Sequence, residues 1–350
     1  MVIQGYPDPG DGLRLHLNEN TGGCSPRVLK AIRNVRRSDV SVYPQYREAV
    51  TATARHFGID PDWVLLTNGL DEGILMAAVG HIAKTKIQDA ETIIPLPAFD
   101  PYPNSTAAVG ATAVQVLPGP DFAFPTKAVI DAITPRTRMI FLNTPNNPTG
   151  QLISIADLMR ISEAAPETVV LVDEAYIEFG GATFLPHLPK YPNVLIGRTF
   201  SKAYGLAGIR LGAVIGQPQA LDPVRSVTLP FNINGVALTA MRAALDDTEF
   251  LPRYAAQVQE SRERLYAACR RLRLQFWPSA ANYVMVRVGQ TAPYVRALAA
   301  RGVHVRDRSK DPTTPGCIRI TTGIIEHTET AIEALDSVVA LRQGPKPAAR

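Results

Sequence analysis

The sequence predicts an α/β protein with a large, doubly wound and mostly parallel sheet, followed by a smaller α+β unit. Between residues 63 and 216, short apolar runs alternate with segments of helical periodicity, which is typical of a parallel sheet covered by helices. Polar clusters of Asn, Gly, Asp and Ser follow several of these runs, at the end of a strand where such sheets bind ligands. After about residue 230 the pattern changes to long helices and a few separate strands.

A chain of 350 residues is longer than an ordinary domain with a single hydrophobic core. Hydrophobic residues make up 46% of it, which is enough to form a large buried core. We therefore expect an N-terminal arm at 1–40 that joins the small domain, a large ligand-binding domain at 41–235, and a C-terminal small domain at 236–350. The small domain is thus built from both ends of the chain.

The charge is nearly balanced, with 36 basic and 32 acidic residues and a net charge of +4. This slight excess favours anionic substrates weakly and gives hardly any support to a nucleic-acid partner. The three cysteines are widely separated, so we expect neither a disulfide framework nor a zinc or other metal site. No targeting segment or membrane span is recognisable, and the sequence predicts a soluble, cytoplasmic protein.

The N-terminal part begins with an arm rich in Gly, Pro and Asp. The segment from Leu13 to Asn20 then ends in a polar cluster that is either a solvated turn or a lip over a binding site. A short helix is expected after Ser25, which caps it, with Pro26 at the first helical position. A turn and a second helix follow between residues 42 and 58.

The predicted strands of the large sheet are the apolar runs WVLLTN, TIIPL, AVQVL, RMIFLN, TVVLVD, NVLIGRT and LGAVIG. Helices are expected to begin near Leu70, Tyr102, Pro125 and Ser154. Polar residues follow four of the strands, at Asn68 and Gly69, at 143–150, at Asp173, and at Ser201 and Lys202, and we expect these groups to converge.

The C-terminal part is predicted to begin with a helix running through MRAALDDTEF and the Arg-rich VQESRERLYAACRRLRL. The strand NYVMVRV, the helix APYVRALAARG and the strands VHVRDR and CIRITTG follow, and a closing helix runs from Glu326 to about Leu341. The tail from residue 344 is expected to be disordered.

Residues 198–212, RTFSKAYGLAGIRLG, place Lys202 beside hydroxyl groups and eight residues before Arg210, among glycines that allow close backbone approach. An amine next to hydroxyls and a guanidinium suits a cofactor with an aldehyde and a phosphate, because the amine forms a Schiff base while the other groups bind the phosphate. The pattern therefore points to pyridoxal phosphate. Alone it is also compatible with a glycine-rich turn and a solvated lysine.

Three further motifs accompany this segment in order: NTPNNPTG at 143–150, VDEAY at 172–176 and CIRITTG at 317–323. Together they resemble the fold-type I pyridoxal-phosphate aminotransferases, most closely the histidinol-phosphate aminotransferase family, over residues 13–340. The most specific parts are NNPTG, VDEAY, the lysine segment, and VRDRSKDPTTPGCIRITTG.

The resemblance implies roles for the residues that match the motifs. Lys202 would bind the cofactor covalently and move a proton between Cα of the substrate and the cofactor. Asp173 would face the pyridine nitrogen of the cofactor, and Tyr176 and Asn147 would form hydrogen bonds with its phenolic oxygen. Phe99 stands where relatives most often have a tyrosine stacked on the ring, and it can still stack.

The phosphate donors implied by the resemblance are Arg210, the hydroxyls of Thr199 and Ser201, and the backbone N–H groups of Leu70 and Asp71 at a helix N-terminus. Tyr43 matches a tyrosine that reaches the phosphate of the neighbouring subunit's cofactor, which implies a homodimer with shared active sites. Alternatively, Tyr43 is an ordinary aromatic residue at a helix entry.

For the substrate, Arg319 matches the arginine that binds an α-carboxylate, and Arg306 matches one used for a substrate phosphate. Asn147 and Asn20 complete the implied substrate contacts. The segment from Asn18 to Gly23 departs from the family pattern NENP. Because this segment lies over the substrate in the family, the substrate side chain accepted here can differ.

The resemblance implies an aminotransferase that acts on L-histidinol phosphate, with 2-oxoglutarate and glutamate as the exchange pair. An aminotransferase for aromatic or other amino acids and a same-fold decarboxylase of the threonine-phosphate type are the alternatives among enzymes. A pyridoxal-phosphate-binding regulator is less consistent, because the residues before Ser25 are too few for an added DNA-binding domain.

Overall fold

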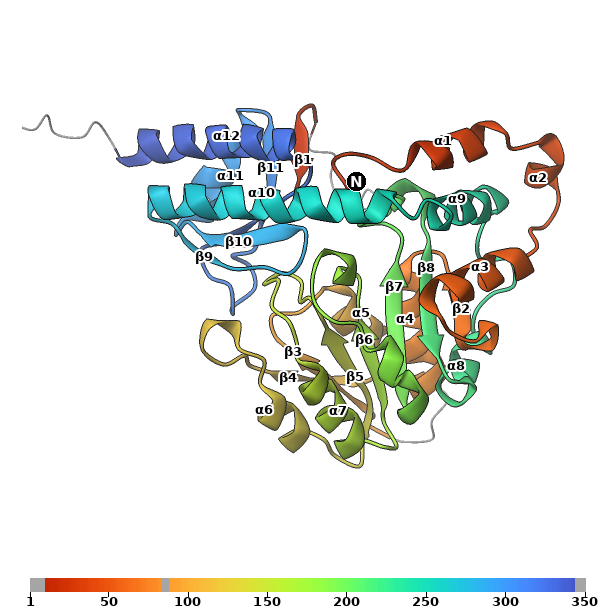
Figure 1. Cartoon of the computed structure of the whole chain (residues 1–350). Helices are drawn as coiled ribbons and strands as arrows, with labels where there is room; N and C mark the ends of the chain where they lie inside the picture. The colour runs from red at the N-terminus through yellow and green to blue at the C-terminus, as the bar shows by residue number, and fades with distance from the viewer. Residues whose placement is uncertain (1–9, 84–87, 344–350) are drawn as a thin grey trace, which may run out of the picture.

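The computed structural model describes residues 10–83 and 88–343, and it contains two β-sheets with helices packed around them (Figure 1). The predictions for the first residues of the arm and for the tail after residue 343 lie outside the described residues. Within these ranges, no helix has the length and hydropathy needed to cross a membrane.

The larger sheet has seven strands in the order β2-β8-β7-β6-β5-β3-β4, and each coincides with a predicted apolar run. The strands are β2 (Val64–Thr67), β3 (Glu91–Pro95), β4 (Thr112–Val116), β5 (Thr137–Asn143), β6 (Val169–Asp173), β7 (Val194–Thr199) and β8 (Gly212–Gly216). Strand β8 runs antiparallel to both β2 and β7, whereas the other pairs are parallel. The predicted mostly parallel sheet is therefore confirmed.

Both faces of this sheet are buried, which explains why its strands are continuous apolar runs. In β5, Ile140 and Leu142 belong to a core that also contains Leu158 of α7, whereas Met139 and Phe141 belong to a second core. Neighbouring side chains of a strand point to opposite faces, so helices must cover both faces. The doubly wound arrangement follows from these two cores.

The helices of the N-terminal two thirds of the chain are α1 (Pro26–Arg33), α2 (Arg37–Ser41), α3 (Arg47–Phe57), α4 (Leu70–Ala78), α5 (Pro101–Ala108), α6 (Thr126–Asp131), α7 (Ile155–Ala164) and α8 (Pro218–Arg225). Ser25 caps α1 as predicted, because its hydroxyl accepts a hydrogen bond from the Arg27 amide. The predicted starts of α4, α5, α6 and α7 agree with the structure to within one residue.

The second sheet has five strands in the order β1-β11-β12-β10-β9. They are β1 (Leu13–Leu15), β9 (Gln275–Trp277), β10 (Tyr283–Arg287), β11 (Val303–Asp307) and β12 (Cys317–Thr321), accompanied by α11 (Thr291–Ala299) and α12 (Ile325–Gln343). The N-terminal strand β1 pairs in parallel with β11 near the other end of the chain. Both ends of the described chain thus contribute to one small sheet.

The predicted single helix before this sheet is wrong, because the structure has two helices, α9 (Gly235–Leu245) and α10 (Phe250–Leu272). Between them, Asp247 accepts a hydrogen bond of 2.5 Å from the Ser25 hydroxyl at the start of α1. Aspartate side chains compete for backbone hydrogen bonds and therefore disfavour helix interiors. Here Asp247 lies between the two helices, and its carboxylate contacts Ser25 instead. Helix α10 then runs beside α12, along the small sheet (Figure 1).

Candidate active site

A cavity of about 390 Å³ opens at the carboxyl ends of the central parallel strands, between the large sheet and the strands β11 and β12. The register brings these ends together, since Asn143 of β5 pairs with Asp173 of β6, and Asp173 pairs with Gly197 of β7. The predicted site residues that line the cavity are Leu70, Asp71, Phe99, Asn147, Asp173, Tyr176, Thr199, Ser201, Lys202, Arg210, Arg306 and Arg319. Segments far apart in the chain therefore converge as the strand-end argument predicted.

Lys202 lies after β7, and its Nζ donates a hydrogen bond of 2.8 Å to the carbonyl oxygen of Leu17. The ammonium also lies 5.9 Å from the centre of the Tyr176 ring. Burial, together with the positive charge of Arg319, lowers the pKa of Lys202 to about 8. The lowered pKa increases the fraction of neutral amine near physiological pH, and a nucleophilic lysine requires this form.

Asp173 ends β6 at the bottom of the cavity, and both of its carboxylate oxygens are held. The Tyr102 hydroxyl donates to Oδ2 at 2.5 Å, and the Ala175 amide donates to Oδ1 at 2.9 Å. Burial raises the pKa of Asp173 to about 6, although these two hydrogen bonds oppose the rise. A buried carboxylate with raised proton affinity suits a protonated ring nitrogen as its partner.

Tyr176 and Asn147 border the cavity above Asp173. The Tyr176 hydroxyl accepts a hydrogen bond of 3.1 Å from Asn18, and burial raises the pKa of Tyr176 to about 12. Oδ1 of Asn147 accepts from a guanidinium nitrogen of Arg319, and the backbone N–H of Asn147 donates to Oδ1 of Asn143 at 2.6 Å. These polar groups thus form a connected layer from one sheet to the other.

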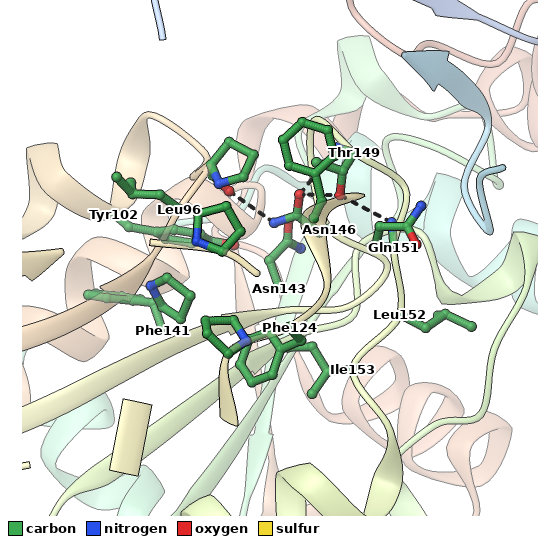
Figure 2. A pocket seen from close by; sticks show the side chains of 15 residues that line it. Leu96, Tyr102, Phe124, Phe141, Asn143, Asn146, Thr149, Gln151, Leu152 and Ile153 are labelled. Carbon is green, nitrogen blue, oxygen red and sulfur yellow. Dashed lines mark hydrogen bonds between the residues drawn. The ribbon is translucent and has the colours of Figure 1, made fainter. Parts of the chain in front are cut away.

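The turn that carries Asn147 is braced from behind, where a small cavity of about 30 Å³ lies against its far side (Figure 2). Asn146 donates to the carbonyl oxygen of Pro97 at 3.1 Å and accepts from the Thr149 hydroxyl at 2.8 Å. Phe141 and Ile153 form apolar walls of this cavity. The turn and ligand interpretations of NNPTG are therefore compatible, because the bracing uses Asn146 and leaves Asn147 facing the main cavity.

The expected phosphate cradle lies at the start of α4. Gly69 has φ +80°, and a Cβ there would lie 2.5 Å from Nη2 of Arg210, so glycine is needed for the guanidinium to approach. Arg210 forms an ion pair of 3.6 Å with Asp71, and the Ser201 amide donates to the Thr199 hydroxyl at 3.2 Å. The N–H groups of the first helical turn, which have no partner within the helix, form with the hydroxyls and the guanidinium a donor set that fits a phosphate.

Two arginines lie directly opposite each other on neighbouring strands of the small sheet, because Arg306 of β11 is the antiparallel partner of Arg319 of β12. Arg319 donates to the neutral oxygens of Asn147 and His16, the latter at 2.7 Å. Burial lowers the pKa of Arg319 to about 10, and Tyr176 and Tyr283 oppose this effect. Like charges directly opposite each other destabilise a sheet, so the pair indicates a place for an anion.

Two predicted residues lie outside this cavity. Asn20 is buried and lines a neighbouring hollow, where its amide nitrogen donates to the carbonyl oxygen of Ala203 at 3.0 Å. Tyr43 is 72% exposed and stacks on Phe231 with ring centres 4.4 Å apart. Within a single chain, Asn20 thus supports the lysine segment, whereas Tyr43 faces outward.

Residues that line the cavity without having been predicted include His16 and Arg308, whereas Asn18 was expected there only as part of the segment Asn18–Gly23. Tyr102, which contacts Asp173, was expected only as a helix start. For Arg308 a signal was available, because it follows Arg306 by two positions and alternation directs both side chains to one face of the sheet. For His16 no local pattern distinguished a lip over the site from a solvated turn.

Comparisons with known proteins agree with this geometry. Residues 10–335 match the family model described as aminotransferase class I and II. A histidinol-phosphate aminotransferase of Symbiobacterium thermophilum is 37% identical over 94% of this chain and 91% of the relative. One of Pseudomonas fluorescens is 35% identical over 95% of this chain and 90% of the relative.

Among solved structures, the chain is similar to a histidinol-phosphate aminotransferase of Sinorhizobium meliloti in complex with pyridoxal-5′-phosphate. The two chains superpose with a TM-score of 0.84 at 28% sequence identity, over 94% of this chain and 91% of the other. Sequence and fold thus indicate the same group of proteins.

Proposed function

The chain belongs to the class I and II aminotransferases, which depend on pyridoxal phosphate, and on that premise we propose that it transfers the amino group of L-histidinol phosphate to 2-oxoglutarate. The products would be imidazole acetol phosphate and glutamate. The names of its relatives support this donor, and so does the chemistry of the cavity.

The observation that carries the choice of donor is the cross-strand pair of Arg306 and Arg319 at the cavity. Histidinol phosphate has no α-carboxylate, so both guanidinium groups can serve its phosphate. Planar guanidinium groups bind such oxyanions through paired, charge-assisted hydrogen bonds. Glutamate and 2-oxoglutarate would use the same arginines for their carboxylates.

The cofactor would be held at its ring and at its phosphate by different parts of the chain. Asp173 would face the ring nitrogen, Phe99 would stack on the ring, and Tyr176 and Asn147 would contact the phenolic oxygen. The phosphate would bind the N–H groups of Leu70 and Asp71, the hydroxyls of Thr199 and Ser201, and Arg210. When bound, pyridoxal phosphate supplies an aldehyde for amine exchange and a ring that stabilises negative charge on the substrate carbon.

Lys202 would bind the cofactor and, once a substrate amine replaces it, move a proton at the substrate carbon that bears the amine. Its lowered pKa supports this role, because a neutral amine accepts that proton and the ammonium returns it. Asn18 and Tyr176 would orient the reacting groups, since their hydrogen bond links the N-terminal segment to the large sheet.

The proposal includes a homodimer in which Tyr43 reaches the partner's cofactor phosphate. Exposed apolar side chains in this part of the chain support it: Val40, Val42, Tyr43, Leu229 and Phe231. Tyr43 and Phe231 also stack on each other, and large apolar side chains that stay exposed together are typical of a surface that another protein covers. A second copy of the chain would give these side chains a self-complementary partner.

We further propose the division into a large domain at 41–235 and a small domain formed by 1–40 and 236–350. The two separate sheets support this division, although α9 packs against α1 and α3 beside the large sheet. A cytoplasmic location is part of the same proposal. The free thiols of Cys24, Cys269 and Cys317 are consistent with a reducing compartment.

The test is to compare kcat/KM of the enzyme loaded with pyridoxal phosphate for histidinol phosphate, histidinol and phenylalanine, with 2-oxoglutarate as acceptor. Histidinol is the matched control because it lacks only the phosphate. Losing a charge-assisted contact costs about 1.5–3 kcal/mol, so we expect histidinol to be at least about tenfold worse. If phenylalanine is the far better donor, the alternative amino-acid aminotransferase is correct and our proposal is wrong.

A further inference from the structure

Arg308 adds a third guanidinium to the cavity that contains Arg306 and Arg319. It follows the last residue of β11, and its amide donates to the carbonyl oxygen of Cys317 at 3.0 Å, which continues the pairing with β12. Arg306 and Arg308 are two positions apart in this extended segment, so their side chains lie on the same face of the sheet.

The Arg308 side chain is only 10% exposed, yet its bonding within the described part of the chain is incomplete. Its Nε is buried without a hydrogen-bond partner. Its ion pair with Asp311 is long, at 3.5 Å, and Oδ1 of Asp311 also accepts from Thr313 at 2.6 Å. Burying a guanidinium with unused donors is costly unless another anion completes its bonding.

The charges of the three arginines also act on one another. The positive charges of Arg308 and Arg306 both contribute to the lowered pKa of Arg319, after burial as the main cause. A single carboxylate carries one negative charge, whereas a phosphate monoester carries nearly two near neutral pH and offers three peripheral oxygens. The cluster therefore matches a phosphate better than a carboxylate.

We infer that Arg308 is a specificity-determining residue: its guanidinium contacts the distal phosphate of the amino donor, beside Arg306 and Arg319, and favours a phosphate over a second carboxylate. This role rests on the proposed function, because it assumes a phosphorylated donor. Arg308 would therefore contribute mainly to binding the phosphorylated amino donor and less to binding glutamate.

The test uses the holoenzyme of the wild type, Arg308→Gln, Arg308→Lys and Asp311→Asn. Each is measured for kcat/KM with histidinol phosphate, histidinol and glutamate, and for competitive inhibition by inorganic phosphate. For Arg308→Gln we expect about a tenfold or greater loss with histidinol phosphate and a similarly weakened inhibition by phosphate, since a charge-assisted bond is lost. Histidinol and glutamate should change much less, and Arg308→Lys should restore part of the selectivity because it keeps the charge.

Asp311→Asn separates binding from support of the loop. If Arg308 merely fixes the loop through Asp311, the Asn variant should reproduce the loss; if Arg308 binds phosphate, the Asn variant should keep the preference for histidinol phosphate. Equal losses of Arg308→Gln with all three donors would overturn the inference. A wild type that prefers histidinol phosphate while Arg308→Gln retains that preference refutes only the role of Arg308. A wild type without the preference refutes the proposed function as well.

Discussion

Tyr102 and Asp173 are joined by a hydrogen bond of 2.5 Å between the phenol hydroxyl and the carboxylate Oδ2, and both side chains are buried. The Tyr102 ring stacks on Phe141 at 4.9 Å and meets the edge of Phe99 at 5.8 Å. One tyrosine thus connects the residue expected to stack on the cofactor ring with the acid expected to face its nitrogen. Removing the Tyr102 hydroxyl should therefore affect Asp173 without leaving a cavity in the core.

We predict that Tyr102→Phe destabilises the cofactor-free protein by about 1–3 kcal/mol at pH 8, because an ionised buried carboxylate then lacks a donor. At pH 5 the loss should be smaller, since Asp173 with its pKa of about 6 is mostly protonated there. Urea unfolding at both pH values measures this difference.

The matched control for this change is Tyr191→Phe, which removes a hydroxyl that donates to the exposed carboxylate of Glu163 at 2.7 Å. Exposed partners are solvated by water, so the control should change the free energy of unfolding by well under about 1 kcal/mol. Equal losses in the two variants, or a loss in Tyr102→Phe that does not vary with pH, would contradict the prediction.

A second prediction concerns the pH dependence that Asp173 gives to stability. Its pKa rises from 3.8 to about 6 in the folded, cofactor-free protein, so the folded state binds this proton more tightly than the unfolded state. The resulting stability is fully present below the unfolded pKa and is lost as the pH rises through about 6. A shift of two units corresponds to about 3 kcal/mol.

Asp173→Asn removes this titration, so the variant should gain up to about 3 kcal/mol relative to the wild type between pH 4 and pH 8. Adding pyridoxal phosphate at pH 8 should then stabilise the wild type more than the variant, because only the carboxylate can pair with a protonated ring nitrogen. Parallel stability curves of the two proteins from pH 4 to pH 8 would show that the carboxyl group has an ordinary pKa.

A third prediction identifies the lysine that binds the cofactor. Borohydride reduction of the holoenzyme, followed by peptide mapping, should attach the cofactor to Lys202, whose Nζ faces the cavity. Lys202→Ala should stay folded, carry no label and lose activity, whereas Lys190→Ala, at an exposed position, should be labelled like the wild type. Label on another lysine in the wild type would refute the assignment.

A fourth prediction tests the shared active sites. Mixing inactive Lys202→Ala with a strongly impaired Tyr43→Ala variant should restore activity, because one site of each mixed dimer would contain both intact residues. Replacing Phe231 by Asp should weaken self-association, since the exposed stack with Tyr43 would be lost. Sedimentation and activity are measured together, and a fully active monomer would rule out the dimeric site.

The large sheet was predictable because each of its strands is buried on both faces and therefore reads as an apolar run. Strands β1 and β9 were missed because each has three residues, and pairing with distant strands rather than local sequence makes them strands. The break between α9 and α10 was also missed, since it depends on a contact between Asp247 and Ser25 that lies 222 positions away.

The residues around Lys202 were predictable in the same way, because polar residues at the ends of parallel strands must meet. Tyr102 was not predictable, and Arg308 was overlooked although strand alternation places it on the same face as Arg306. Their relevance comes from burial and from a specific partner, as in the contact of Tyr102 with Asp173. The sequence pattern alone contains neither the burial of a side chain nor the identity of its partner.

The pairing of β1 with β11 also determines when the protein can become functional during its synthesis. Leu13 pairs with Val303, so a chain emerging from the ribosome carries β1 without its partner until β11 has been made. The large sheet can form earlier, because its strands end at residue 216. Segment 16–19, which closes the cavity and accepts the hydrogen bond of Lys202 at Leu17, must therefore be among the last parts to settle. The complete cavity, which includes Arg306 and Arg319, can therefore form only after the strands of the small sheet have been made.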